Sequence, residues 1–384
     1  MPWTPPPGQE AYYSLPSPSS THSLLSQLLH RPPLDTQGKP DPTWGRRALP
    51  RAPDEVEVRE RYGCRDGRVK TEDGEVAYQV WEPKKGVESK EADIVWCHGI
   101  NDYGGKFAVH APIFLDAGYR VIVPDLPSHG RSTGIHVWIP KMSSLADAVY
   151  AVITDVMLQD SQLIQEREGR AETHLTQKRK VFVAGQSLGG FTAVYTCLKY
   201  GTPPTSSLPP SSGGDTEHTF HPTLSGGIFL CPMLAISPES RPSYAVELVA
   251  RGLAAVAGPL PFANANKGKN TEDPEVEEQF EADPQTYHGK LRIATGLAIL
   301  AGLLEFNAKM EHLKIPFLLC HGTGDRVTSP SGSQLLLNRA ESKDKELKLY
   351  EGFEHILLRK GRDEKDDERR MRVLGDVMEW LGRH

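Results

Sequence analysis

Two serines of this chain, Ser187 and Ser132, lie in the pattern Gly-x-Ser-x-Gly, in which a serine can act as the nucleophile of an acyl-transfer reaction. The pattern requires a buried strand that ends in a sharp turn and opens directly into a helix. The apolar run 180–184 precedes Ser187, and residues 191–198 continue after it at helical spacing. A polar loop precedes Ser132, and Pro140 follows it closely. The sequence therefore predicts that Ser187 is the nucleophile and that Ser132 is a loop residue.

A serine hydroxyl is a weak nucleophile at neutral pH, so it needs a general base and an acid that orients this base. Asp325 follows the apolar segment 316–320, and His355 follows the last predicted strand. The preceding apolar segment, 227–231, ends without a carboxylate, which favours Asp325 as the acid. Taken alone, the aspartate could cap a turn and the histidine could be an ordinary surface residue. Their order behind predicted strands favours a catalytic triad with Ser187.

Catalysis by such a serine also needs two backbone N–H groups that bind the developing oxyanion. Leu188, directly after the nucleophile, is expected to supply one amide, and Ile100, in the loop after an early strand, the other. His98 lies in the same loop and is expected to shape it by hydrogen bonding. Asp125 and His129 are interpreted in the same way as structural turn residues.

Short apolar segments alternate with helix-length segments over most of the chain, which is typical of a mostly parallel sheet covered by helices on both faces. The predicted fold class is therefore α/β. The predicted strands are residues 68–71, 75–81, 93–97, 119–123, 180–184, 227–231, 316–320 and 347–350.

The chain divides into four predicted regions. Residues 1–53 are rich in Pro and Ser and are expected to be a disordered extension, with a targeting or partner-binding tail as the alternative. Residues 54–231 form the first part of the core, with a low-complexity surface insert at 201–223, and residues 313–384 form the second part. Between them, residues 232–312 are too long for an ordinary crossover and are predicted to form a helical cap at the ligand-binding edge of the sheet.

Composition excludes several classes of protein. The 384 residues carry a net charge of −6 with both signs interspersed, which gives no nucleic-acid-binding footprint. The five cysteines form no C-x-x-C pair, and no His/Cys ligand spacing is present, so we predict no disulfide framework, metal or cofactor. The chain begins with no signal-peptide pattern and contains no run of 18 apolar residues. A cytoplasmic location is therefore expected.

Five short segments carry a family resemblance: residues 96–99 (WCHG), 125–134 (DLPSHGRSTG), 185–190 (GQSLGG), 321–325 (HGTGD) and 351–355 (EGFEH). Together they resemble the monoglyceride lipase family of α/β-hydrolases, which is also described as serine aminopeptidase S33-like or lysophospholipase-like and which includes plant esterases of phenolic esters. The resemblance covers roughly residues 65–383 and implies an α/β-hydrolase fold, with an inserted helical cap.

By the family pattern, Ser187, Asp325 and His355 are the triad, and the amides of Ile100 and Leu188 form the oxyanion hole. Two departures from the pattern are visible. Ser128 stands where the family usually has Gly, and Ile100 is bulkier than the usual small residue, which could narrow the acyl channel.

The expected function is hydrolysis of carboxylic esters through an acyl-enzyme intermediate, as by a monoacylglycerol lipase that releases a fatty acid and glycerol. An esterase or lysophospholipase for other small, aromatic or single-chain esters is the alternative, and a non-catalytic ligand-binding relative is a further one. Residues 244–256 carry apolar side chains around most of a predicted helix. They could line an acyl channel and touch a membrane or lipid-droplet surface, or could simply pack on the sheet.

Overall fold

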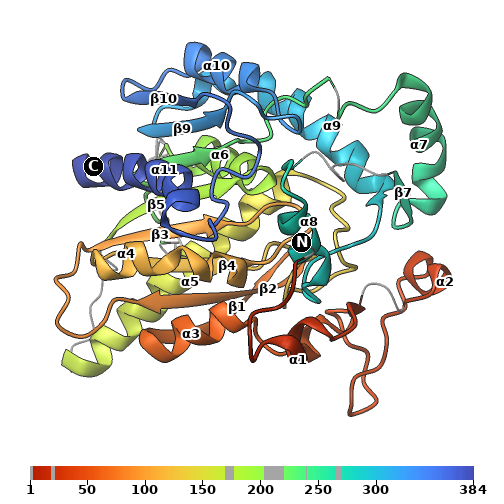
Figure 1. Cartoon of the computed structure of the whole chain (residues 1–384), viewed down its shortest axis with the longest axis horizontal. Helices are drawn as coiled ribbons and strands as arrows, with labels where there is room; N and C mark the ends of the chain where they lie inside the picture. Colours follow the sequence, from red (N-terminus) through yellow and green to blue (C-terminus); the bar gives the residue numbers. More distant parts are fainter. Residues whose placement is uncertain (1–2, 19–21, 169–176, 203–219, 239, 264–269) are drawn as a thin grey trace, which may run out of the picture.

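The structure is a computed structural model of the chain, and it describes residues 3–18, 22–168, 177–202, 220–238, 240–263 and 270–384 (Figure 1). Most of the predicted surface insert, residues 203–219, lies outside the described residues. Among the helices that are described, none is long and apolar enough to cross a membrane.

An eight-stranded sheet forms the centre of the molecule, in the order β1-β2-β4-β3-β5-β6-β9-β10. The first two strands pair antiparallel, as does β2 with β4, and all other neighbours pair parallel. The predicted α/β class and mostly parallel sheet are confirmed. The strands are β1 (Gly63–Thr71), β2 (Gly74–Glu82), β3 (Ala92–Cys97), β4 (Arg120–Pro124), β5 (Lys180–Gln186), β6 (Gly226–Leu230), β9 (Phe317–Gly322) and β10 (Lys345–Tyr350).

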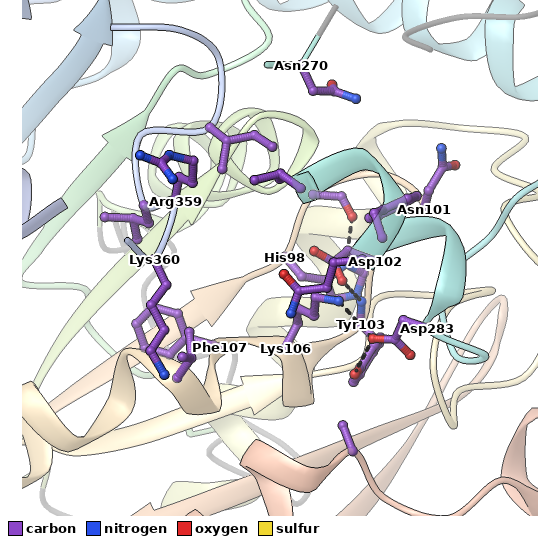
Figure 2. A pocket seen from close by; sticks show the side chains of 18 of the residues that line it. His98, Asn101, Asp102, Tyr103, Lys106, Phe107, Asn270, Asp283, Arg359 and Lys360 are labelled. Carbon is purple, nitrogen blue, oxygen red and sulfur yellow. Dashed lines mark hydrogen bonds and ion pairs between the residues drawn. The ribbon is translucent and has the colours of Figure 1, made fainter. Parts of the chain in front are cut away.

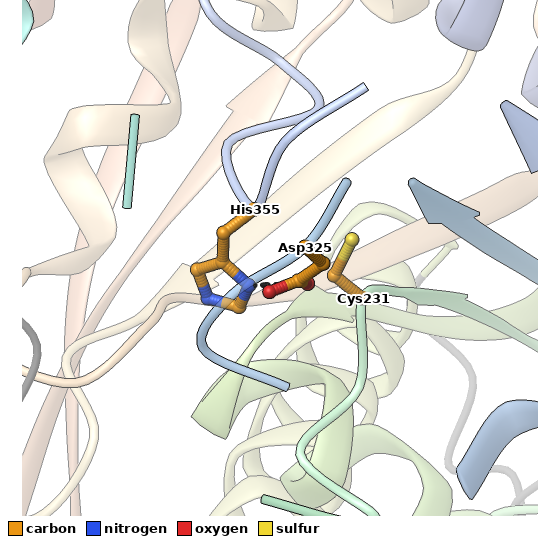
Figure 3. A group of neighbouring side chains, drawn as sticks. All are labelled: Cys231, Asp325 and His355. Atoms are coloured by element: carbon orange, nitrogen blue, oxygen red, sulfur yellow. Dashed lines mark hydrogen bonds and ion pairs between the residues drawn. The ribbon is translucent and has the colours of Figure 1, made fainter. Parts of the chain in front are cut away.

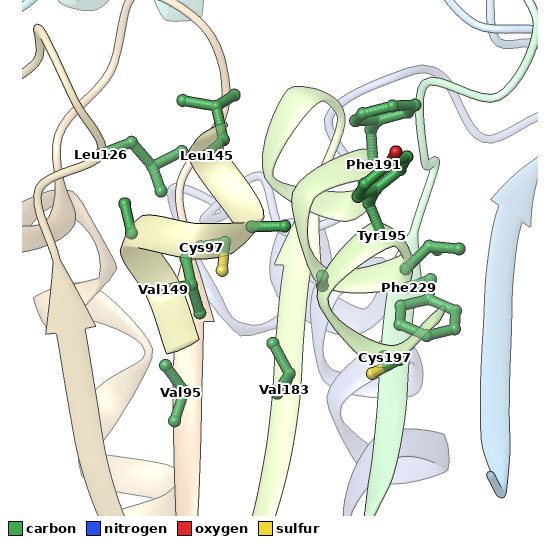
Figure 4. Packing of buried hydrophobic residues seen from close by; sticks show 14 of the residues in the cluster. Val95, Cys97, Leu126, Leu145, Val149, Val183, Phe191, Tyr195, Cys197 and Phe229 are labelled. Carbon is green, nitrogen blue, oxygen red and sulfur yellow. The ribbon is translucent and has the colours of Figure 1, made fainter. Parts of the chain in front are cut away.

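Helices cover both faces of this sheet, which explains why its inner strands β3, β4 and β6 are buried along their whole length. One face packs against α3 (Pro53–Arg61), η3 (Gly104–Val109), α4 (Ala111–Asp116) and α11 (Glu364–Arg383). The other packs against α5 (Ser143–Glu168), α6 (Leu188–Tyr200) and α10 (Pro330–Arg339). Figure 4 shows side chains of α5 and α6 meeting those of β3, β5 and β6 in this second core.

The connection between β6 and β9 carries the elements of the predicted cap. They are α7 (Tyr244–Ala257), β7 (Pro261–Ala263), α8 (Pro274–Ala282), β8 (Leu291–Arg292), α9 (Ile293–Asn307) and η4 (Met310–His312). Helix α9 joins the main core through Ile299, Leu303 and Phe306, whereas α7 stands at the periphery of the molecule (Figure 1). The boundaries at 232 and 312 remain a prediction.

The N-terminal region is folded onto the body of the protein, with the short helices α1 (Glu10–Tyr13), α2 (Leu24–Leu28) and η2 (Arg46–Ala48). Arg46 is fully buried and donates hydrogen bonds to the carbonyl oxygens of Gly130, Ser132 and Gly134. The predicted disorder of residues 1–53 is therefore wrong for the described residues of this region. Contacts of Arg46 with a distant loop of the chain, rather than local apolar content, help to hold this region in place.

Candidate active site

Ser187 occupies the sharp turn between β5 and α6, so the predicted strand and helix are both present on either side of it. Its backbone adopts φ 58° and ψ −120°, a conformation that L-residues rarely hold outside such turns. A Cβ atom at Gly189 would lie 2.0 Å from the carbonyl oxygen of Cys97, and one at Gly185 would lie 2.4 Å from the carbonyl oxygen of Gly189. The flanking glycines are therefore needed because β3 and the start of α6 pass so close to the turn.

Ser132 has a different role. It is fully buried, its Oγ accepts a hydrogen bond from the amide of Ala77 at 2.8 Å, and it donates to the carbonyl oxygen of Asp125 at 2.5 Å. These bonds tie its loop to β2. The interpretation of Ser132 as a loop residue is confirmed.

Asp325 and His355 follow β9 and β10, and the fold brings their side chains into contact. Oδ2 of Asp325 lies 2.7 Å from Nδ1 of His355, and both residues are buried. Oδ1 accepts the amides of Val327 and Thr328 at 2.8 and 2.9 Å, and the Thr328 hydroxyl donates to Oδ2 at 2.8 Å. The carboxylate is therefore held in one orientation, with one oxygen directed at the imidazole (Figure 3).

Two further side chains surround this carboxylate, and sequence analysis assigned no role to either. Nε2 of His321 lies 3.3 Å from Oδ2 of Asp325, and the possible ligand atoms of Cys231, Asp325 and His355 lie within 4.8 Å of one another. Burial and the charge of Asp325 raise the pKa of the Cys231 thiol well above its usual range, so the sulfur stays protonated. A neutral thiol is a poor metal ligand. In the sequence, only the position of His321 at the start of the HGTGD segment could have indicated that it lies beside Asp325.

Burial by itself would raise the pKa of Asp325, but hydrogen bonds from His321, His355 and Thr328 outweigh it and hold the pKa well below its usual range. The carboxylate is therefore ionised at neutral pH. An ionised carboxylate at Nδ1 favours the tautomer whose other nitrogen, Nε2, can accept a proton.

Ser187 and His355 line the same cavity, whose volume is about 790 Å³. The loop after β3 also lines it, through Gly99 and Ile100. Within the described parts of the chain, the amides of Ile100 and Leu188 donate to no backbone carbonyl. Asp325 thus contacts His355, and His355 and Ser187 line one cavity. The assignment of the amides of Ile100 and Leu188 to an oxyanion hole stays a prediction.

The loop histidine next to this cavity is structural. Nε2 of His98 accepts the amide of Leu126 at 3.0 Å, and Nδ1 lies 2.8 Å from the carbonyl oxygen of Gly99. Burial lowers the pKa of His98 to about 4, so the ring is neutral. Asp125 similarly accepts the amides of Gly104 and Arg131. The interpretation of these two side chains as loop-shaping residues is confirmed.

One of the two departures from the family pattern has a conformational counterpart. Ser128 adopts φ 67°, a left-handed conformation that favours glycine. Its backbone nevertheless bonds both Thr133 and Val137, so the turn is retained with serine.

Charged and aromatic side chains line the rest of the cavity. Nζ of Lys106 lies 2.7 Å from Oδ2 of Asp283, and Figure 2 shows this pair next to Tyr103 and Asp102. Burial raises the pKa of Asp102 to about 6, although the nearby Lys106 lowers it. The aromatic lining comes from Trp3, Tyr13, Trp96, Tyr103, Phe107, Phe280 and Tyr287.

Comparison with known proteins agrees with this architecture. Residues 88–208 and 215–361 match the family model described as Serine aminopeptidase, S33. The chain belongs to this family. Its relatives include caffeoylshikimate esterase of Arabidopsis thaliana, which is 31% identical over 288 residues that make up 74% of this chain and 75% of that protein.

A second relative is the monoacylglycerol lipase of Mycolicibacterium smegmatis, which is 27% identical over 309 residues that make up 80% of this chain and 93% of that protein. Among solved structures, a soluble variant of the monoglyceride lipase of Saccharomyces cerevisiae, in complex with a substrate analog, superposes with a TM-score of 0.59. It is 17% identical and covers 83% of this chain and 94% of that one, so it shows the fold. The resemblance to the monoglyceride lipase family of α/β-hydrolases is confirmed.

Proposed function

We propose that this protein hydrolyses carboxylic esters through an acyl-enzyme intermediate, with Ser187 as nucleophile, His355 as general base and Asp325 as the group that orients it. The observation that carries the proposal is the 2.7 Å contact between Asp325 and His355 beside a cavity that Ser187 also lines. Membership of a hydrolase family supports the reaction class.

In the proposed reaction, Oγ of Ser187 attacks the ester carbonyl carbon while Nε2 of His355 accepts the hydroxyl proton. The amides of Ile100 and Leu188 donate to the oxyanion that forms. The tetrahedral intermediate breaks its bond to the alcohol oxygen, which takes the proton from His355. Water then attacks the acyl-enzyme in the same way, which releases the acid and restores the serine.

The proposed substrate is a monoacylglycerol, which would yield a fatty acid and glycerol. Two observations support it. Several relatives carry the name monoacylglycerol or monoglyceride lipase, in organisms as distant as Mycolicibacterium smegmatis and Homo sapiens. A cavity of about 790 Å³ is also within the size range of sites that enclose a molecule as large as a drug.

An esterase for aromatic esters is a second candidate, and a specific observation favours it. Seven aromatic side chains line the cavity, and the 31% identical relative is named caffeoylshikimate esterase. An aromatic ring of a substrate gains binding free energy when it stacks on aromatic side chains of such a lining. Hydrolysis rates for monoacylglycerols and for hydroxycinnamate esters, compared in one assay, separate the two candidates.

Labelling with a fluorophosphonate tests the reaction itself. We expect the wild-type protein to be labelled and Ser187→Ala to remain unlabelled. Ser132→Ala is the matched control, because it removes the serine of the other Gly-x-Ser-x-Gly segment. Its loss should lower stability by about 1–3 kcal/mol, since the buried amide of Ala77 loses its acceptor, but should leave labelling intact. Labelling of Ser187→Ala at the wild-type rate would refute the proposed nucleophile.

We further propose that residues 232–312 act as a cap and that α7 touches a membrane or lipid-droplet surface. Tyr244, Leu248, Val249 and Val256 of α7 are each more than half exposed. The alternative, that these side chains pack on the sheet, is not supported by their exposure. Exposed apolar helices of this kind bind lipid interfaces. All five cysteines are free thiols, which suits a reducing, cytoplasmic location.

Flotation with phosphatidylcholine vesicles tests this contact. Leu248→Glu should weaken vesicle binding several-fold, because it places a charge on the face that would enter the lipid. Leu335→Glu, at an exposed leucine of α10, is the matched control and should bind like the wild type. Equal binding by all three proteins would refute a role for α7.

A further inference from the structure

The described N-terminal residues 3–18, which we call the N-terminal strap, form part of the cavity that Ser187 lines. Trp3, Pro6, Gln9 and Tyr13 all face this cavity. The family match begins only at residue 88, so the strap is not part of what the family model covers.

A buried polar cluster fastens the strap to the body. The hydroxyl of Tyr12 donates to Oδ1 of Asp283 at 2.8 Å and accepts a hydrogen bond from Nε2 of Gln285 at 2.9 Å. Oδ2 of the same carboxylate accepts from the hydroxyl of Tyr103 at 3.0 Å and from Nζ of Lys106 at 2.7 Å. One carboxylate therefore joins the strap, the connection between α8 and β8, and the loop after β3.

The charge state of this cluster is well defined. Burial alone would raise the pKa of Asp283. The charge of Lys106 and the hydrogen bonds that the carboxylate accepts outweigh burial and lower this pKa below its usual range. The carboxylate is thus ionised, and hydrogen bonds to a charged acceptor are about twice as strong as neutral ones. The ring of Tyr12 packs with Ala52 and Tyr103 in a small apolar cluster of its own.

Other contacts extend the attachment along the cap. The amide of Trp3 donates to Oε2 of Glu278 in α8, and the hydroxyl of Ser17 donates to the carbonyl oxygen of Thr286. The strap therefore contacts both α8 and the residues that follow it, and Figure 1 shows the start of the described chain beside α8.

The face that the strap presents to the cavity is aromatic. The rings of Trp3 and Tyr13 pack edge to face, with centroids 4.9 Å apart, and Phe280 of α8 lines the same cavity. A ring or an alkyl chain that reaches this wall buries apolar surface there, whereas an acetyl or methyl group near Ser187 is too short to extend far along the cavity.

We propose that the N-terminal strap is a fixed wall of the substrate cavity that favours esters with a long or aromatic group, and that Tyr12 is the positioning residue that holds it there. This rests on the proposed function, because the ester must be bound at Ser187 for the wall to act on it.

The test compares Tyr12→Ala and Tyr12→Phe with the wild-type full-length chain. Tyr62→Phe is the matched control, because its hydroxyl also donates to a carboxylate, Asp116, at 2.8 Å but does not line the cavity. Two pairs of esters are assayed: methyl acetate against methyl laurate, and methyl acetate against 2-naphthyl acetate.

We expect Tyr12→Ala to lower kcat/KM for the larger ester at least tenfold in at least one pair, mainly through KM. The kcat/KM for methyl acetate should change less than threefold. Tyr12→Phe keeps the ring and should lie between wild type and Tyr12→Ala. Tyr62→Phe should leave both selectivity ratios unchanged. Unchanged ratios in Tyr12→Ala would overturn the role of the strap in selectivity.

Hydrogen exchange provides a readout that does not depend on activity. Residues 279–292 should exchange at least tenfold faster in Tyr12→Ala than in the wild type, and at the wild-type rate in Tyr62→Phe. Unchanged exchange in Tyr12→Ala would overturn the anchoring role. If the wild type neither hydrolyses esters nor reacts with a fluorophosphonate, the proposed function fails and the selectivity role with it, but exchange still decides the anchor. If Tyr12→Ala does not fold, both readouts are taken on Tyr12→Phe.

Discussion

The replacement Asp325→Asn tests the proposed triad most directly, because the surroundings of this side chain determine how an amide must orient. Oδ1 accepts two backbone amides, those of Val327 and Thr328, so the amide oxygen of the variant has to occupy this place. The amide nitrogen then takes the place of Oδ2, 2.7 Å from Nδ1 of His355. Since that nitrogen is a donor, Nδ1 must become an acceptor and the imidazole proton must move to Nε2.

A proton on Nε2 prevents His355 from accepting the proton of Ser187. In serine proteases this change of tautomer lowers kcat by about 10⁴, which corresponds to about 5.4 kcal/mol of transition-state stabilisation. We expect a loss of similar size here, with KM for a soluble 4-nitrophenyl ester changed little, because Asp325 itself does not line the cavity. Steady-state kinetics and the rate of fluorophosphonate labelling measure the effect.

Asp125→Asn is the matched control for this experiment. Its carboxylate also accepts two backbone amides, from Gly104 at 2.8 Å and Arg131 at 2.7 Å, but among the described residues no hydrogen bond or ion pair joins it to a histidine. We expect it to lose stability and to keep kcat within a few-fold for the folded protein. If Asp325→Asn also retained kcat within tenfold of the wild type, the assignment of Asp325 as the orienting acid would be refuted.

Two further predictions concern the turn and the response to acid. Gly189→Ala should abolish labelling by the fluorophosphonate or lower the free energy of unfolding by more than about 3 kcal/mol, because its Cβ would lie 2.0 Å from the carbonyl oxygen of Cys97. A Cβ at Gly252 would have no atom within 4 Å, so Gly252→Ala should instead raise the free energy of unfolding by about 0.5–1 kcal/mol in thermal or urea unfolding. Equal effects of the two substitutions on stability would contradict the argument from close approach at Gly189. Burial lowers the pKa of His98 to about 4 and that of His110 to about 3, so both bind protons more readily when unfolded. Their contribution to stability is complete above pH of about 6.5 and is lost as pH falls toward 4, by about 1.4 kcal/mol per pH unit for each. Urea unfolding between pH 7.5 and 5 measures this, and a flat free energy of unfolding would contradict it.

Much of the fold and of the candidate site could be predicted because the relevant signals are local. Short apolar runs specify buried strands, since a parallel sheet covered on both faces requires apolar residues along the whole strand. The glycines on either side of Ser187 indicate the tight turn directly, because a larger side chain at either position would clash with the backbone. Asp325 and His355 could be chosen because the order of strands in the chain predicts which loops reach the catalytic edge.

The environment of Asp325 could not be predicted in the same way. His321 and Cys231 lie beside it at two different strand ends. Apart from the place of His321 in the HGTGD segment, nothing in their local sequence distinguishes them from other buried residues of those strands. Their role depends on the register of β6, β9 and the loop between β9 and α10, which only the folded sheet determines.

The N-terminal region shows the difference between what local composition predicts and what contacts with distant residues determine. Its Pro- and Ser-rich composition predicts that it cannot build a core of its own. Whether it is ordered depends instead on acceptors elsewhere: Tyr12 bonds Asp283, 271 residues away, and Arg46 bonds carbonyls more than 80 residues away. The sequence by itself determined the strands, the turn at Ser187 and the order of the predicted triad. The tertiary structure decided which distant groups meet, because a hydrogen bond between remote residues leaves no local pattern in either segment.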